Sequence, residues 1–301
     1  MKKPDIFGTP VFDCINGIIC LGDEINGLVL WNPATREHKV VPKPFCDLFD
    51  SVNFAFGYDH NSNDYKVVRV VTFEGHHGEL ILPSVVHVHV YNLSTDSWRQ
   101  IDPTFDPSIT YFPGDCDELY LNGVHHWPSC RSIDEHGQHC KVIVCFDMID
   151  EVFRTIRMPD LGDISHINKI GKTSAVLSNC VALIVYDMNE TVIEKTFDIW
   201  VMREYGVEES WTKQFIIKPG LIFQRTNHFV GAGELLFVGD KLLLVNGNKG
   251  QILLYDFGTQ EIKNLQLRNC SDSFCVSRLM IYVESLVSVK GGNVFESLMC
   301  P

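Results

Sequence analysis

Short apolar stretches separated by polar turns recur along the whole chain, and almost no segment has the spacing of an amphipathic helix. Many such stretches at near-regular spacing predict an all-β architecture. The clearest candidate strands are residues 17–21, 28–31, 67–71, 86–91, 142–146, 181–186, 242–245 and 252–255.

One strand–turn–strand unit recurs five times. In each copy an apolar strand ends at a turn, and a second strand follows. Successive copies lie 60, 55, 54 and 55 residues apart when the following positions are taken as equivalent: Asn32, Asn92, Asp147, Val201 and Asp256. A period near 50 residues with several strands per unit is typical of kelch-like propeller blades. We therefore predict an all-β fold, a β-propeller of five to six kelch-like blades.

No linker or low-complexity tract divides the chain, so we expect a single domain over residues 1–301 with an incomplete first blade. Strands near residues 274–282 and 286–289 are expected to supply a sixth blade. Large rings flank the turns, and we expect them to pack between neighbouring blades. These rings are Trp31, Tyr91, Phe146, Trp200 and Tyr255 before the turns, and Trp98, Phe153 and Trp211 after them.

Acidic residues dominate the charge, with 38 Asp and Glu against 25 Lys and Arg and a formal net charge of −13. Such a surface repels nucleic acid and anionic membranes and attracts basic partners, although acidity also serves solubility alone. No apolar run reaches the roughly 18 residues that span a bilayer. Pro4, Asp5 and Gly8 interrupt the start, where a secretory signal needs an apolar stretch. The eleven scattered cysteines suit reduced thiols. We expect a cytoplasmic protein that binds neither nucleic acid nor membranes.

Catalytic motifs are absent from the sequence: there is no nucleophile elbow, Walker loop or dinucleotide-binding glycine motif. A propeller glycosidase would need paired carboxylates. The candidates stand at strand ends or turns, where aspartate is a common turn former; they are Asp59, Asp64, Asp147 and Asp256. We therefore expect that the chain is not an enzyme and needs no cofactor.

Histidines and cysteines are frequent in and around residues 125–145, which raises the question of a zinc site. The side chains in question are His125, His126, Cys130, His136, His139, Cys140 and Cys145. Their spacing matches no paired Cys-x-x-Cys or His-x-x-x-His site, and histidine also suits polar loops. We expect no metal.

Several phrases of the sequence are distinctive. They are CINGIICL at residues 14–21, LWNPATR at 30–36, FGYD at 56–59, DYKVVR at 64–69, YNLSTDSWR at 91–99, VHHW at 124–127 and MREYGVEESW at 202–211. Together they resemble plant F-box-associated domains, and most closely the S-locus F-box and S-locus F-box-like group. The resemblance covers nearly the whole chain in order.

The resemblance implies a substrate-recognition module of an SCF-type ubiquitin ligase, which holds a target protein while a separate F-box binds a Skp adaptor. In pollen members the target would be a basic S-RNase of the self-incompatibility response. Only about a dozen residues precede the first expected strand, and none reads as an F-box. We therefore expect a Skp adaptor and cullin as partners only where an upstream F-box exists. The alternative is an orphan propeller that binds protein or glycan ligands without a ligase.

One loop in each repeat leads into the strand before the turn: residues 22–27, 74–84, 129–140, 187–196 and 246–250. Equivalent loops of a propeller emerge on one face, and their unequal lengths mark a variable surface, where binding usually occurs. Their formal charges sum to −6, so we expect an acidic face. The predicted partner-binding residues are Asp23, Glu24, His76, His77, Glu79, Arg131, Asp134, Glu135, His136, Asp187, Glu190 and Glu194.

Overall fold

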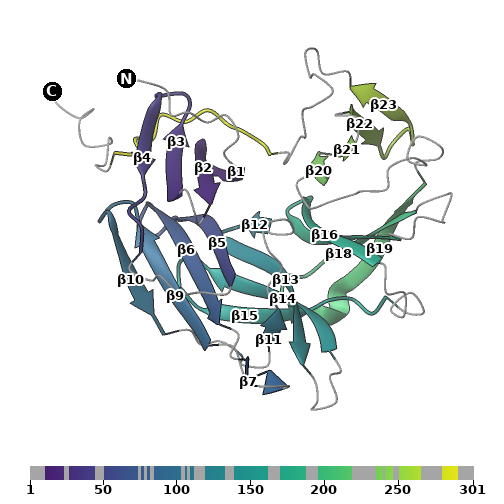
Figure 1. Cartoon of the computed structure of the whole chain (residues 1–301). Helices are drawn as coiled ribbons and strands as arrows, with labels where there is room; N and C mark the ends of the chain where they lie inside the picture. The colour runs from purple at the N-terminus through teal and green to yellow at the C-terminus, as the bar shows by residue number, and fades with distance from the viewer. Residues whose placement is uncertain are drawn as a thin grey trace.

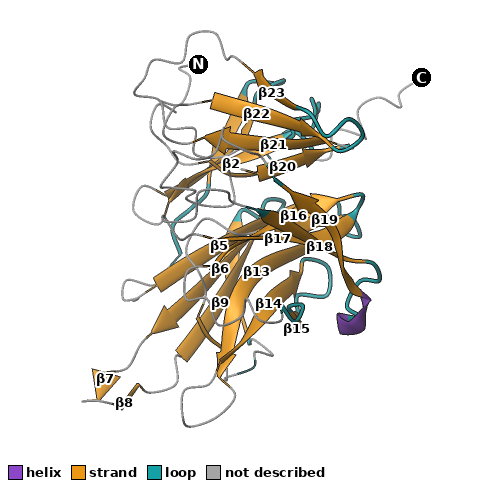
Figure 2. Cartoon of the chain, turned by 90° about the vertical axis from the view of Figure 1, so that its right-hand side faces the viewer, coloured by secondary structure: helices purple, strands orange, loops and turns teal. Residues whose placement is uncertain are grey.

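Five antiparallel sheets follow one another along the chain, and Figure 1 shows them set around an arc as the blades of a β-propeller. The predicted all-β propeller is confirmed. The computed structural model describes residues 11–23, 27–44, 51–73, 76–77, 80–81, 85–102, 106, 109–111, 119–132, 139–161, 170–187, 196–218, 235–239, 241–246, 251–265 and 280–290. Strands dominate the regular structure of this part of the chain (Figure 2), and none of its helices has the length and apolarity needed to cross a bilayer.

The blades share one strand order. Blade 1 contains β1 (Val11–Ile15), β2 (Ile18–Asp23), β3 (Gly27–Asn32) and β4 (Glu37–Val40). Blade 2 contains β5 (Ser51–Asp59), β6 (Asp64–Phe73), β9 (Val85–Asn92) and β10 (Ser97–Ile101). Blade 3 contains β11 (Ile109–Tyr111), β12 (Leu119–Leu121), β13 (Val124–Ser132), β14 (His139–Asp147) and β15 (Phe153–Arg157).

The last two blades repeat the pattern. Blade 4 contains β16 (Ile170–Leu177), β17 (Cys180–Asp187), β18 (Phe197–Met202) and β19 (Trp211–Ile217). Blade 5 contains β20 (Leu235–Val238), β21 (Lys241–Asn246), β22 (Gln251–Asp256) and β23 (Ile262–Leu265). Two short strands, β7 (His76–His77) and β8 (Leu80–Ile81), form a separate hairpin between β6 and β9.

The central strand β17 is apolar from Val181 to Tyr186 because neighbouring blades cover both of its faces. In β17, Val181, Leu183 and Val185 pack toward blade 3. The alternate residues Ala182, Ile184 and Tyr186 pack toward blade 5. The outer strand β19 keeps only its two ends buried. A continuous apolar run therefore marks the inside of a blade, and an alternating polar strand marks its rim.

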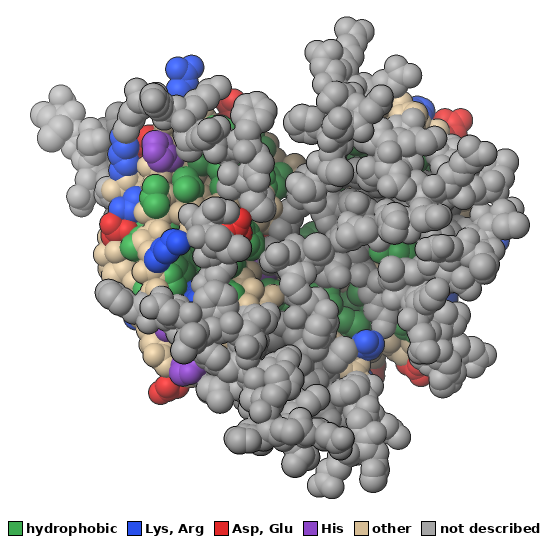
Figure 3. All heavy atoms as spheres, viewed as in Figure 1, with side chains coloured by type: hydrophobic (Ala, Val, Ile, Leu, Met, Phe, Trp, Pro, Cys, Tyr) green, Lys and Arg blue, Asp and Glu red, His purple; other side chains and the backbone are tan. Residues whose placement is uncertain are grey.

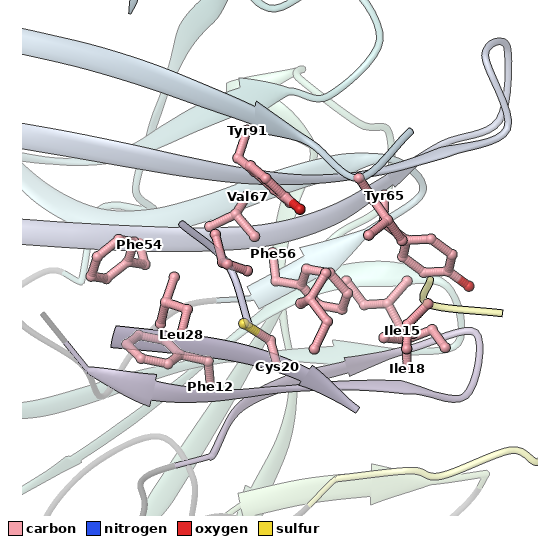
Figure 4. Packing of buried hydrophobic residues seen from close by; sticks show 14 residues of the cluster. Phe12, Ile15, Ile18, Cys20, Leu28, Phe54, Phe56, Tyr65, Val67 and Tyr91 are labelled. Carbon is pink, nitrogen blue, oxygen red and sulfur yellow. The ribbon is translucent and has the colours of Figure 1, made fainter. Parts of the chain in front are cut away.

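Hydrophobic clusters fill four junctions, between blades 1 and 2, 2 and 3, 3 and 4, and 4 and 5. Figure 4 shows the first of them, where Phe12 and Leu28 of blade 1 face Phe54 and Phe56 of blade 2. The Phe12 and Phe54 rings meet edge to face at 5.6 Å. Among the residues that the structure describes, no such cluster joins blade 5 to blade 1.

The rings before the turns occupy these junctions in blades 2 to 5. Each of them faces the preceding blade: Tyr91, Phe146, Trp200 and Tyr255. Trp98, Phe153 and Trp211 lie in the same junctions, as predicted. Trp31, the equivalent ring of blade 1, is only half-buried and lies in none of the four clusters. The prediction is wrong for Trp31 because the side of blade 1 that it faces is the one without a described cluster.

The turns between third and fourth strands are built by the polar residues that define the repeat. The side-chain Oδ1 atom of Asn32, Asp147 or Asp256 accepts the backbone N–H groups two and three residues later, at 2.9–3.3 Å. Four residues after the turn position in blades 1, 2, 3 and 5, the backbone is left-handed, at Arg36, Asp96, Glu151 and Gln260. In blade 4 the hairpin continues past Val201: Met202 pairs with Trp211, and the Arg203 N–H donates to the Ser210 carbonyl oxygen as Asp147 and Asp256 do in their turns, so the equivalence assumed for Val201 is wrong.

A buried ion cluster joins blade 2 to blade 3. Lys66 Nζ lies 2.8 Å from the Asp59 carboxylate, 2.9 Å from the Glu151 carboxylate and 2.6 Å from the Met148 carbonyl oxygen. Arg99 also donates to Glu151. Burial opposes the charged form of Asp59, but hydrogen bonds from Lys66 and Ser62 outweigh it and hold the pKa of that carboxyl below its usual range. The FGYD and DYKVVR segments, which contain Asp59 and Lys66, thus contribute to the packing of blade 2 against blade 3.

Residues 280–290, the crossing segment, run extended between blade 5 and blade 1 (yellow in Figure 1). Asn32 Nδ2 donates to the carbonyl oxygens of Ser285 and Val287 at 2.9 and 2.7 Å. Val289 is fully buried in the junction of blades 1 and 2. The prediction of a sixth blade is wrong for residues 286–289, because they form no strand, pair with none of the described strands and attach to blade 1 through the Asn32 side chain. Residues 274–279 lie outside the described residues.

Candidate functional site

The five predicted loops each connect the second strand of a blade to the third. Every blade has the same antiparallel order, so each loop has the same place in its own blade. The 74–84 loop carries the extra β7–β8 hairpin, which projects from blade 2 at the lower end of the molecule in Figures 1 and 2. Loop length therefore varies at one position of the blade while the strands stay constant. This is typical of a recognition surface carried on a rigid scaffold.

Five of the predicted partner-binding residues are placed by the structure. Asp23 ends β2 opposite Gly27. His76 and His77 form β7, Arg131 lies on β13 opposite Ile109 and Cys140, and Asp187 ends β17 opposite Ile170. The others lie outside the described residues: Glu24, Glu79, Asp134, Glu135, His136, Glu190 and Glu194. The acidic face stays a prediction.

Charge on the visible part of blades 1 and 2 is mixed. In Figure 3, basic, acidic and histidine side chains lie beside one another on the left of the molecule. Lys39 of blade 1 pairs with Asp96 of blade 2, and Lys290 of the crossing segment pairs with Glu37 of blade 1. This part of the surface is therefore not a uniformly acidic patch.

The opposite end of blades 3 and 4 holds a pocket of about 400 Å³. Two hairpin turns and the long β18–β19 connection meet there. Its lining residues are Leu121, Asn122, Val124, Asn179, Cys180, Val181, Met202, Arg203 and Tyr205. The turns after the first strands place the two asparagines at its rim, with left-handed φ angles of 50° and 60°.

Tyr205 is held against blade 3 by His126. The hydroxyl of Tyr205 lies 2.9 Å from His126 Nε2, and His126 Nδ1 lies 3.2 Å from the Leu119 carbonyl oxygen. Burial lowers the pKa of His126 to about 4, so the ring is neutral at pH 7. A carbonyl oxygen only accepts, so the single ring proton is on Nδ1 and the Tyr205 hydroxyl donates to Nε2. The Tyr205 ring, half-exposed, therefore has a fixed position beside the pocket.

The β18–β19 connection also contacts the outer strand of blade 3. Trp211 Nε1 donates to the Arg157 carbonyl oxygen at 3.0 Å, and Glu208 accepts the Arg157 N–H at 3.1 Å. Figure 2 shows the 3-10 turn η2 (Glu208–Ser210) beside β15. The sequence signal for this arrangement is the interval from Met202 to Trp211, which is longer than the other turns of its kind.

The histidines considered for zinc that the structure describes do not come together as a metal site. His125 and His126 are consecutive on β13, so their side chains point to opposite faces. His125 lies 4.4 Å from the Trp127 ring, in the direction of blade 2, and His126 faces blade 4. Within the described ranges, no three His, Cys, Asp or Glu side chains are grouped as a metal site requires. His136 lies outside these ranges.

Comparison with known proteins agrees with this architecture. The model of the F-box associated beta propeller domain matches residues 3–289. F-box protein CPR1 of Arabidopsis thaliana is 29% identical over 296 residues, which cover 93% of this chain and 68% of that protein. F-box protein At4g22390 of the same plant is 27% identical over 295 residues, covering 93% and 69%.

Among solved structures, the nidogen/laminin complex is similar with a TM-score of 0.40 and 10% identity, covering 85% of this chain and 78% of that one. The family match spans all five blades and includes most of the crossing segment. The chain therefore belongs to the F-box associated β-propeller domain family.

Proposed function

We propose that this chain is the substrate-recognition module of an SCF-type ubiquitin ligase and binds a target protein without catalysing a reaction. The observation that carries the proposal is the family match over residues 3–289, together with relatives that are F-box proteins. The loops between second and third strands support it, since they vary in length at one position of a constant blade. A basic S-RNase is the finer candidate for the target, and acidic loops would attract it.

The ligase role is tested by supplying an F-box. The 301 residues are expressed alone and fused behind an F-box that binds a Skp adaptor. We expect the fusion to recruit adaptor and cullin and to support ubiquitination of a captured protein, while the chain alone captures the same protein without the adaptor. The opposite result is a fusion that recruits the ligase without any captured protein becoming ubiquitinated. That result would contradict the proposal and favour an orphan propeller.

Target binding through the loops is tested with charge variants. One variant neutralises an acidic residue in each of four loops: Asp23→Asn, Glu79→Gln, Asp134→Asn and Asp187→Asn. The matched control neutralises four exposed acidic residues elsewhere: Glu204, Glu209, Glu261 and Glu284. Association with a purified basic S-RNase is measured at low and physiological salt, because charge steering weakens as salt screens it.

We expect the loop variant to associate more slowly at low salt and the control to behave like the unmodified chain. Equal slowing in both variants would mean that net charge alone attracts the ribonuclease. No association with any variant would exclude the S-RNase while leaving the ligase test open.

A further inference from the structure

The pocket between blades 3 and 4 has an apolar floor. Leu121, Val181 and Met202 are buried beneath it, and the half-exposed Tyr205 ring stands beside it. Its volume of about 400 Å³ is within the range of small-ligand sites. The space suits one apolar side chain with its neighbouring backbone.

One cation stands at the rim. Arg203 is exposed, and its side chain donates a long hydrogen bond of 3.4 Å from Nε to Thr212 Oγ1. Within the described part of the chain, no carboxylate lies within 4.0 Å of its guanidinium. By contrast, Arg99 and Arg154 are each paired with a carboxylate. A guanidinium presents a planar fork of donors that matches a carboxylate in two-point contact.

The pocket wall is fixed before any ligand arrives. His126 holds the Tyr205 hydroxyl, and Trp211 fixes the end of the same connection on blade 3. Arg203 lies at the start of this connection, between the buried Met202 and the anchored Tyr205. A wall that is already ordered costs less conformational entropy on binding.

We infer that this pocket binds a peptide carboxylate that lies next to an apolar side chain, with Arg203 contacting the carboxylate and the floor taking the side chain. Asn122 and Asn179 supply amide groups at the rim for the peptide backbone. The carboxylate is either a chain terminus or an Asp or Glu side chain. This site is formed by the turns at the opposite end of the blades from the predicted loop face, so it depends neither on those loops nor on a ligase.

Methionine methyl groups offer a direct readout. Met202 lines the pocket, whereas Met148 is buried in the junction of blades 2 and 3. The full chain is labelled with methyl-¹³C methionine, and a Met202→Leu variant assigns the signal. Three probes are titrated: acetyl-Gly-Gly-Leu with a free carboxylate, the same peptide as an amide, and acetyl-Gly-Glu-Leu-Gly amide.

We expect the Met202 signal to shift with at least one carboxylate peptide and not with the first peptide's amide, while Met148 stays constant. A shift with the first probe alone identifies a terminal carboxylate, and a shift with the third alone identifies a side chain. Arg203→Gln should weaken binding about tenfold. Lys263→Gln, the same change of charge on blade 5, should leave it unchanged.

Three results would overturn the inference. They are a constant Met202 signal with all probes at millimolar concentration, equal shifts with the acid and amide forms, and unchanged affinity in Arg203→Gln. Arg203→Lys separates charge from fork geometry, since it keeps the charge and loses the two-point contact. We expect Arg203→Lys to bind with an affinity between those of the unmodified chain and Arg203→Gln. An affinity as low as that of Arg203→Gln would also support two-point contact by the guanidinium.

Discussion

The ammonium group of Lys66 lies 2.8 Å from the Asp59 carboxylate, and both side chains are almost closed to solvent, at 5% and 6% exposure. Glu151 of blade 3 accepts from the same ammonium at 2.9 Å. One buried cation therefore balances carboxylates from two blades. Removing a single member of such a cluster leaves charge that neither water nor a partner stabilises.

Lys66→Met should therefore destabilise the fold by about 3–5 kcal/mol, because Asp59 would remain buried without its cation and Glu151 would keep only the half-exposed Arg99. The measurement is the free energy of unfolding in urea at pH 7. Lys39→Met is the matched control, since its partner Asp96 is 50% exposed and such pairs contribute about 1 kcal/mol or less. Equal losses in the two variants would show that the buried cluster has no special role.

Acid should weaken the fold in part through His126. Its pKa of about 4 in the folded chain lies below the ordinary value of 6.5, so the unfolded chain binds the proton first as the pH falls. The stability that neutral His126 provides is present above pH 6.5 and is lost toward pH 4, by roughly 3 kcal/mol in all. His126→Gln should lack this part of the pH dependence. The exposed His60→Gln is the control and should retain it. Unfolding free energies at pH 7 and pH 4.5 are compared.

Asn32→Asp should release the crossing segment while keeping the turn of blade 1. The Oδ1 acceptor for the Ala34 and Thr35 N–H groups remains, but the two hydrogen bonds from Nδ2 to the crossing segment are lost. We expect a loss of about 1–3 kcal/mol, since two part-buried carbonyl oxygens lose the Asn32 amide donor.

Hydrogen exchange of residues 283–290 gives the local readout for this variant and should become faster. Asp147→Asn makes the reverse change in an equivalent turn of blade 3 and should leave exchange in the crossing segment unchanged. Protection of the segment in Asn32→Asp equal to that of the unmodified chain would contradict the role given to the Asn32 amide.

Gly17→Ala should displace the crossing segment as well. A Cβ at Gly17 would lie 2.5 Å from the Ser285 Cβ and 2.6 Å from the Val283 carbonyl oxygen. Gly206→Ala is the matched control, because its φ of 80° is close to the 79° of Gly17 and nothing lies within 4 Å. Both variants carry the backbone strain of about 1–2 kcal/mol, so an additional loss should occur only in Gly17→Ala, together with faster hydrogen exchange at residues 283–290.

The repeat could be predicted from sequence because each turn uses local chemistry. Asp147 and Asp256 bond the backbone two and three residues later, so their spacing is visible in the chain itself. In blade 4 a bulge between Ile199 and Trp200 shifts the register, and the assumed equivalence of Val201 fails there. Such bulges depend on the partner strand and leave no clear mark in composition.

Contacts between residues far apart in the sequence could not be predicted from such local patterns. The crossing segment has the apolar pattern of a strand, but its attachment depends on Asn32, more than 250 residues earlier. The pocket likewise depends on the His126–Tyr205 contact across 79 residues. The interval from Met202 to Trp211 in the sequence indicates the long turn that carries Tyr205. The position that this turn adopts is set by its packing on blade 3.

The attachment of residues 285–287 to Asn32 also has a consequence for synthesis on the ribosome. The first blade emerges early, but the carbonyl groups that satisfy its buried Asn32 amide come 253 and 255 residues later. At a synthesis rate of 5–20 residues per second, the Asn32 amide is without these two acceptors for a time on the order of tens of seconds. During translation, blade 1 is therefore formed first and completed last. Until residues 285–287 are synthesised, the Asn32 amide is free to bind another extended segment of the chain.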